Sequence, residues 1–221
     1  MTELDTRFAL SDVIGRAHTR LRPLDDAEAV DLAYPAPRGD GDLEGGFRYV
    51  GTRPLRPAAV LVGLLDRDGE AHVLLTLRTA HLSSHAGQIA FPGGKVEPDD
   101  PSPCATALRE AEEETGLRSR YVDLIGLLDP YVTGTGYRVV PVVASIRPGF
   151  TLSPDPGEVA DVFDVPLSFL MDPANHQRHS REWQGQIRHY YAMPYFDRYI
   201  WGATAGILRN FYERLYAGEG R

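Results

Sequence analysis

Two apolar runs on either side of a short turn constrain the fold of this chain more than any other feature. The runs are AAVLVGLL at residues 58–65 and AHVLLTLR at residues 71–78, with DRDGE between them. An Asp-Gly pair between apolar runs is typical of a β-hairpin. Both runs are apolar almost throughout, which is typical of strands that are covered on both faces. We therefore expect a hairpin in the middle of a layered fold.

Further strands and two helices surround this hairpin. Strand candidates lie at residues 122–128, 138–146, 159–165 and 187–192, and helix candidates at residues 103–115 and 203–216. One stripe of the last helix consists of Ala203, Ile207, Phe211 and Leu215. Strands before, between and after two helices predict an α/β (α+β) protein with a mixed β-sheet between helices.

The first 50 residues differ in character from the rest of the chain. Residues 1–33 are weakly helical and lead into YPAPRGDGDLEGGF, a stretch whose proline and glycine content is typical of a linker without a packing pattern. We expect an N-terminal helical and linker extension at residues 1–50 and one compact domain at residues 51–221.

Composition and charge narrow the classes of partner. The 221 residues are 43% hydrophobic and 24% charged, enough for one full core and short for two. The formal net charge of −8 disfavours nucleic acid and anionic membranes, because both attract cationic surfaces. A small polyanionic ligand stays compatible, since local arginines or a bound metal can reverse the sign of one cleft. The single cysteine, Cys104, fits a reducing compartment, and neither a signal peptide nor a membrane span is recognisable, so we expect a soluble cytoplasmic protein.

The stretch REAEEETG, residues 109–116, crowds four glutamates ahead of a glycine that suits a helix end. Ser102 and Pro103 suit the start of the same helix. At about 100° per residue, Glu110, Glu113 and Glu114 share one arc of this helix. The opposite side carries a stripe of small or apolar residues: Cys104, Leu108, Ala111 and Thr115. Like charges at these spacings cost about 0.2–0.5 kcal/mol per pair, so another factor must favour the acidic arc.

A divalent cation is the factor that we expect. Three carboxylates within one helical turn form an all-oxygen site that suits Mg²⁺ or Mn²⁺, whereas zinc favours His or Cys. The cation would turn mutual repulsion into shared attraction. The alternative is a solvated acidic face, which is common on Glu-rich helices. Arg109 lies beside the arc, four residues before Glu113, where it can orient a carboxylate.

The loop in front of this helix, FPGGKVEPDD, contains the pair Gly93-Gly94. Glycine lets the backbone approach a ligand closely. After a strand and before an acidic helix, the pair would expose amides and carbonyls toward the glutamates. Phosphate oxygens would then bridge the backbone donors and the metal.

The segment GGKVEPDDPSPCATALREAEEETGL resembles the signature box of the Nudix hydrolases, in which a glycine and an acid precede Arg-Glu-x-x-Glu-Glu-x-Gly-hydrophobic. The matching residues are Gly94, Asp100, Arg109, Glu110, Glu113, Glu114, Gly116 and Leu117. The upstream segment LLTLRTAHLSSHAGQIAFPGG, residues 74–94, is similar to the one that marks coenzyme A diphosphatases in that superfamily. The same subfamily commonly has aspartate as the first acid and one extra residue before the arginine, as this chain does.

The resemblance implies a Nudix-type α/β/α sandwich. It also implies an enzyme that uses Mg²⁺ or Mn²⁺ to hydrolyse the diphosphate bond of coenzyme A, and of acyl-coenzyme A as a further substrate, into 3′,5′-ADP and 4′-phosphopantetheine. The implied metal ligands are the Gly94 carbonyl and the carboxylates of Glu110, Glu113 and Glu114. Arg109 is expected to act as a positioner that pairs with Asp100 or Glu113.

The general base and the substrate contacts stay open. Glu110 and Glu158, in the loop DPGEV, are both candidate bases, and an ordinary loop carboxylate is the alternative for Glu158. Arg78 can reach a phosphate or lie at the rim of the site. His85 can donate to a phosphate or pack within its turn, while Gly93 and Gly94 would bind substrate through the backbone. One group of aromatic residues can stack on adenine or pack beneath the last helix: Tyr190, Tyr191, Tyr195, Phe196 and Trp201.

Other substrates and another functional class are the alternatives. Within the same superfamily, the substrate can be another nucleoside diphosphate derivative, such as ADP-ribose, NADH or a dinucleotide. A ligand-sensing module usually loses box carboxylates and carries a DNA-binding region, whereas this chain keeps all three carboxylates and has no basic helix-turn-helix in residues 1–50. A homodimer stays open.

Overall fold

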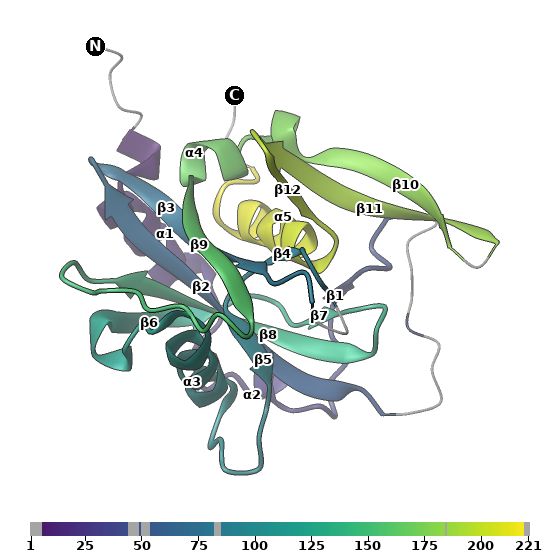
Figure 1. The fold of residues 1–221 in the computed structure, drawn as a ribbon, viewed down its shortest axis with the longest axis horizontal. Coiled ribbons are helices and arrows are strands. Elements are labelled where there is room, and N and C mark those ends of the chain that lie inside the picture. Colours follow the sequence, from purple (N-terminus) through teal and green to yellow (C-terminus); the bar gives the residue numbers. More distant parts are fainter. Residues whose placement is uncertain (1–5, 44–48, 50–53, 82–84, 184, 219–221) are drawn as a thin grey trace.

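The predicted hairpin is present and lies at the centre of the fold. Its strands are β2 (Arg56–Arg67) and β3 (Glu70–Arg78), which pair antiparallel. The turn between them places Asp68 at φ 52° and Gly69 at φ 92°, the left-handed conformations that a two-residue hairpin turn needs. Figure 1 shows the computed structural model of the protein, which describes residues 6–43, 49, 54–81, 85–183 and 185–218.

Strand β2 organises a mixed sheet. It pairs in parallel with β8 (Tyr137–Ile146) along most of its length. At its other edge it pairs antiparallel first with β5 (Gly93–Lys95) and then with β3. Within the described residues this sheet has nine strands, and the remaining ones are β1 (Arg38–Gly39), β4 (Ile89–Ala90), β6 (Val122–Leu127), β7 (Tyr131–Val132) and β9 (Val159–Pro166).

Helices cover both faces of this sheet, as the sequence predicted. Helix α3 (Pro103–Thr115) packs on one face, with Leu61 and Val142 beneath it. Helices α1 (Leu10–Arg20) and α5 (Ala203–Leu215) pack on the other face, where Val62 and Val143 point. Neighbouring residues of β2 and β8 thus face opposite layers, which explains why both strands are apolar almost throughout. In Figure 1, α3 and α5 lie on opposite sides of the central strands.

A second, smaller sheet lies beyond α5. It consists of β10 (Gln177–Trp183), β11 (Gln186–Tyr195) and β12 (Arg198–Trp201), all antiparallel. The sequence predicted only residues 187–192 as a strand here. Met193 and Ile200 are fully buried in the core cluster that includes α5, whereas β10 is largely exposed and polar and therefore shows no strand pattern.

The N-terminal residues pack on the domain rather than lying apart from it. In α1, Val13 and Ala17 are fully buried, and Arg20 donates to the carbonyl oxygen of Leu215. After it follows α2 (Ala27–Val30), whose Ala29 carbonyl accepts from the buried Arg138. The prediction of an unpacked linker at residues 34–47 is wrong for residues 38–43, because β1 pairs with β7 and Leu43 is buried. Residues 44–48 and 50–53, where the predicted domain boundary falls, lie outside the described residues.

Short helices complete the chain. They are η1 (Thr6–Phe8), η2 (Ser119–Tyr121), α4 (Leu167–Leu170) and η3 (Pro173–Asn175). In the part of the chain that the structure describes, every helix is too short or too polar to cross a membrane.

Candidate active site

Helix α3 begins and ends where the sequence predicted. The Ser102 side chain accepts the backbone N–H of Ala105 at 3.2 Å, and Pro103 occupies the first turn. Gly116 ends the helix at φ 73°, and its N–H donates to the Glu112 carbonyl. These caps fix which residues of the acidic stretch lie in the last turns.

The paired glycines lie directly against this helix. A Cβ atom on Gly93 would stand 2.5 Å from the Ala59 carbonyl oxygen and 2.6 Å from Val60 Cα, so only glycine fits there. A Cβ atom on Gly94 would stand 2.5 Å from Glu110 Cδ. The Glu110 carboxylate therefore rests against the backbone of Gly94, as expected if both serve one site.

Arg109 holds the acidic residues together. Its guanidinium forms two parallel bonds with Asp100, at 3.1 and 2.9 Å. Its Nη1 donates to both Glu110, at 3.1 Å, and Glu113, at 2.9 Å. The expected pairing is present with both partners, Asp100 and Glu113, while the positioning role of Arg109 stays a prediction. The Arg109 guanidinium also holds the pKa of the Asp100 carboxyl well below its usual range.

Glu114 lies elsewhere than the sequence predicted. We expected it on an arc opposite the apolar stripe, but its residue is only 3% exposed. One carboxylate oxygen accepts the N–H of Gly93 at 3.0 Å, and the other accepts from Arg78 Nη1 at 3.1 Å. Burial raises the pKa of Glu114 to about 7, although the Gly93 N–H and Arg78 oppose the rise. The predicted place opposite the apolar stripe is wrong, because Glu114 borders the buried face and finds two donors there, while its role as a metal ligand stays a prediction.

Glu158 approaches the same region from a distant part of the chain. Its half-exposed carboxylate lies 4.0 Å from Arg78 Nη2, and its backbone carbonyl accepts the N–H of Thr79 at 2.9 Å. The sequence left the position of Arg78 open. In the structure this arginine lies between Glu114 and Glu158. The charge of Glu158 also raises the pKa values of Glu110 and Glu114. Glu158 is therefore part of the acidic cluster.

The donor chemistry of the cluster fits a hard divalent cation. Glu110, Glu113, Glu114 and the Gly94 carbonyl offer only oxygen atoms, which Mg²⁺ and Mn²⁺ prefer. Burial raises the pKa of Glu110, Arg109 lowers it, and Glu113 and Glu158 raise it again, so added positive charge would relieve the repulsion. Among the described side chains, no three of the His, Cys, Asp and Glu residues converge on one point at metal-binding distance. Arg109 supplies the positive charge between Glu110 and Glu113 in this arrangement.

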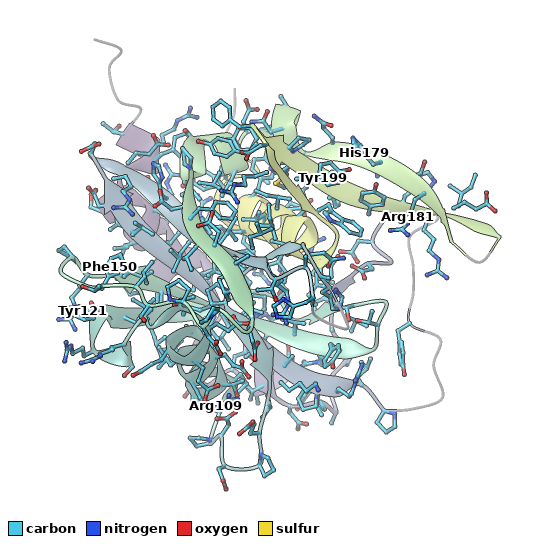
Figure 2. The ribbon with its side chains drawn as sticks, viewed as in Figure 1. Arg109, Tyr121, Phe150, His179, Arg181 and Tyr199 are labelled. Carbon is cyan, nitrogen blue, oxygen red and sulfur yellow. The ribbon has the colours of Figure 1, made fainter. Side chains whose placement is uncertain are left out.

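The other predicted contact residues lie farther from the glutamates or have local partners. His85 adopts φ 57°, and its Nδ1 lies 2.8 Å from Gln88 Oε1, which matches the turn-packing interpretation. Among the aromatic residues, Tyr191 and Tyr195 pack against the core as expected. Phe196 does not, because it is 90% exposed at the β11–β12 turn. Figure 2 shows the exposed sheet face with His179 and Tyr199 well away from α3.

Two residues that hold site residues in place were not predicted from the sequence. Thr106 donates to Asp100 Oδ2 at 2.9 Å and thereby helps to hold the partner of Arg109. Asp155 accepts the N–H of Gly157 at 2.8 Å in the turn before Glu158. The sequence Asp-Pro-Gly is a turn signal that would have identified the second residue.

Comparisons with known proteins identify the family of this chain. A family model described as the NUDIX domain matches residues 54–184. An uncharacterized Nudix hydrolase NudL of Yersinia pestis is 34% identical over 215 residues, which cover 97% of this chain and 99% of that protein. The Nudix hydrolase 15, mitochondrial, of Arabidopsis thaliana is 43% identical over 158 residues, and the match covers 68% of this chain and 55% of that protein.

Solved structures that match part of this chain include two enzymes. One is a binary complex of a C. elegans Ap4A hydrolase, with a TM-score of 0.44 and 19% identity, over 50% of this chain and 80% of that chain. The other is RenU, a Nudix hydrolase from M. smegmatis, with a TM-score of 0.44 and 26% identity, over 58% of this chain and 81% of that chain.

Proposed function

The chain belongs to the Nudix hydrolase family, and on this premise we propose that it hydrolyses the diphosphate bond of coenzyme A. The products would be 3′,5′-ADP and 4′-phosphopantetheine, and acyl-coenzyme A would be a further substrate. The observation that supports diphosphate hydrolysis best is the Glu110 carboxylate resting against Gly94, because a carboxylate of the acidic helix then lies beside the backbone that is proposed to share the metal. The choice of coenzyme A follows from the resemblance of residues 74–94 to the segment typical of coenzyme A diphosphatases.

The acidic residues and Gly94 would hold the cofactor. In this proposal, Glu110, Glu113, Glu114 and the Gly94 carbonyl are the ligands of Mg²⁺ or Mn²⁺. The bound cation would supply positive charge that neutralises the diphosphate and the charge developing on the leaving group. Arg109 would orient Glu110 and Glu113, and Asp100 would hold Arg109 in place.

Glu158 is our candidate for the general base. Its carboxylate is half exposed, and among the described residues its ion pair is with Arg78, at 4.0 Å, whereas Glu110 already accepts from Arg109. It would take a proton from the attacking water as the water oxygen bonds to phosphorus, and the bond from phosphorus to the bridging oxygen would break. The bridging oxygen would leave with the other phosphate group. Arg78 and the backbone of Gly94 would bind phosphate oxygens, whereas His85 and the Gly93 N–H already have partners in Gln88 and Glu114.

Product analysis tests this function directly. The protein would be incubated with Mg²⁺ and, separately, with coenzyme A, ADP-ribose, NADH and a dinucleotide, and the products would be identified by mass spectrometry. We expect 3′,5′-ADP and 4′-phosphopantetheine, with coenzyme A as the best substrate. If a substrate that lacks both the 3′-phosphate and pantetheine is cleaved faster, that compound and not coenzyme A is the substrate. Cleavage of none would overturn the proposal.

A further inference from the structure

The loop that carries Glu158 is attached to the end of helix α3. The N–H of Ser153 donates to the Thr115 carbonyl at 2.8 Å, and the N–H of Asp155 donates to the Glu114 carbonyl at 3.1 Å. Carbonyls in the last turn of a helix have no partner within the helix, so a loop can use them as attachment points. Glu114 therefore contributes its side chain to the acidic cluster and its backbone to the loop.

Asp155 uses its backbone and its side chain to shape the turn before Glu158. Its Oδ1 accepts the N–H of Gly157 at 2.8 Å, which is the hydrogen bond of an Asx-turn. Its carbonyl accepts the N–H of Glu158 at 3.0 Å and the N–H of Val159 at 2.8 Å. Four hydrogen bonds at one residue thus connect the end of α3 to the backbone of Glu158.

The far side of the turn has its own attachment to β3. The N–H of Thr79 donates to the Glu158 carbonyl at 2.9 Å, and the Thr79 hydroxyl donates to the Gly157 carbonyl at 3.4 Å. The next residue, Val159, is buried and begins β9. Glu158 is therefore held between the acidic helix on one side and the strand of Arg78 on the other.

We propose that Asp155 is a positioning residue, which sets the place of the Glu158 carboxylate relative to Glu114. The inference rests on the proposed function, in which Glu158 takes the proton of the attacking water. The backbone of Asp155 binds the Glu114 carbonyl and the Glu158 N–H, and its side chain closes the turn between them by accepting the Gly157 N–H. The side chain therefore holds the shape of the turn that presents Glu158 to the cluster. A misplacement of about 1 Å at a reacting group can lower a rate by about a hundredfold.

The side chain of Asp155 is suited to a clean test because it is exposed at the surface. Asp155→Ala removes the acceptor of the Gly157 N–H, whereas Asp155→Asn keeps an oxygen at the same place. Asp172→Ala is a matched control, since Asp172 Oδ1 accepts the N–H of Ala174 at 2.9 Å in an exposed turn at η3. Asp155→Ala and Asp172→Ala thus each remove one hydrogen bond, from different turns, and Asp155→Asn removes none.

Steady-state kinetics on the substrate that product analysis identifies give the first result. We expect Asp155→Ala to lower kcat by about tenfold or more with KM nearly unchanged, and Asp155→Asn and Asp172→Ala to stay close to wild type. In a Glu158→Gln background, Asp155→Ala should have no additional effect on kcat, because the residue that it positions no longer acts. Full additivity of the two changes, or a wild-type kcat for Asp155→Ala, would overturn the inference.

Amide hydrogen exchange gives a second result that does not depend on activity. The N–H groups of Gly157, Glu158 and Val159 should exchange faster in Asp155→Ala than in wild type and Asp155→Asn. Unchanged exchange in Asp155→Ala would also overturn the inference. If Glu158→Gln alone keeps the wild-type rate and pH profile, the assignment of Glu158 as the base fails instead, whatever Asp155 does to the turn.

Discussion

The Glu114 carboxylate accepts the backbone N–H of Gly93 at 3.0 Å and thereby joins the acidic helix α3 to strand β5. With only 3% of its surface exposed, Glu114 is as much a part of the framework as of the site. Its other oxygen binds Arg78, which lies at the end of β3. One buried side chain thus sets the distance between three elements that carry candidate catalytic residues.

This arrangement predicts different stabilities for two neighbouring glutamate variants. Glu114→Ala leaves the Gly93 N–H and the Arg78 guanidinium without their carboxylate, so we expect a loss of about 1–3 kcal/mol in the free energy of unfolding. The Glu113 side chain is 60% exposed, and Glu113→Ala should change stability by less than about 0.5 kcal/mol. Both variants should lose activity at least about tenfold.

Urea denaturation of both variants, together with kcat, checks this difference. If Glu114→Ala is as stable as the wild type, the hydrogen bonds of Glu114 with Gly93 and Arg78 make no net contribution to the free energy of unfolding. Full activity of either variant with saturating Mg²⁺ would remove that glutamate from the mechanism.

The close approach of Gly94 to Glu110 predicts a second effect. Gly94→Ala would place a methyl group on the Glu110 carboxylate, so we expect that carboxylate to move and the rate to fall by about tenfold to a hundredfold. Gly15→Ala is the control, because nothing lies within 4 Å of its added methyl group in α1. That control should be neutral or more stable by about 0.5–1 kcal/mol. Enzyme kinetics and thermal unfolding of both variants measure these effects. A wild-type kcat in Gly94→Ala would contradict the close contact between Gly94 and the Glu110 carboxylate.

A third prediction concerns pH and the attachment of the N-terminal residues. Burial works to raise the pKa of Asp129, but hydrogen bonds from Arg214 and Arg22 outweigh it and hold the pKa below its ordinary value. A carboxyl whose pKa is lower in the folded state stabilises the protein above its unfolded pKa, and this contribution disappears as the pH falls through the folded pKa. Asp129→Asn should therefore lower the free energy of unfolding by about 1–3 kcal/mol at pH 7, and the difference from wild type should shrink below about pH 4.

Denaturation between pH 3 and 7 measures this difference. Asp123→Asn serves as the control, since Asp123 pairs with Arg147 at 3.0 Å but both side chains are more than half exposed. Such a surface pair contributes about 0–1 kcal/mol. A gap between Asp129→Asn and wild type that stays constant down to pH 3 would rule out the ionised form of Asp129 as its source.

Local signals made most of the fold predictable. The Asp68-Gly69 turn, the Ser102 cap and the Gly116 end each depend on neighbouring residues only, and all three lie where the sequence indicated. The burial of Glu114 did not follow from helix periodicity, because it borders the buried face, three residues after Ala111. Whether such a border residue is buried depends on the distant groups that face it, here Gly93 and Arg78.

Contacts over long sequence separations account for the other differences. Residues 10–43 attach to the domain partly through polar contacts, such as that between Arg22 and Asp129, which leave no apolar pattern in the sequence. Strand β4 has two residues and β5 has three, too short for alternation to appear. Glu158 was named from its family resemblance, and its approach to Arg78 depends on the pairing of β3 with β9.

The central claim is that the clustered carboxylates of α3 hold a divalent cation, and binding of Mn²⁺ tests it most directly. Isothermal titration would compare the wild type with the triple variant Glu110→Gln, Glu113→Gln, Glu114→Gln. The exposed single variant Glu113→Gln covers the case that the triple variant does not fold, and Glu112→Gln on the same helix is the control. We predict that wild type and Glu112→Gln bind Mn²⁺ alike, that Glu113→Gln binds it more weakly, and that the triple variant does not bind it. Mn²⁺ binding of wild-type strength by Glu113→Gln and the triple variant would contradict the account.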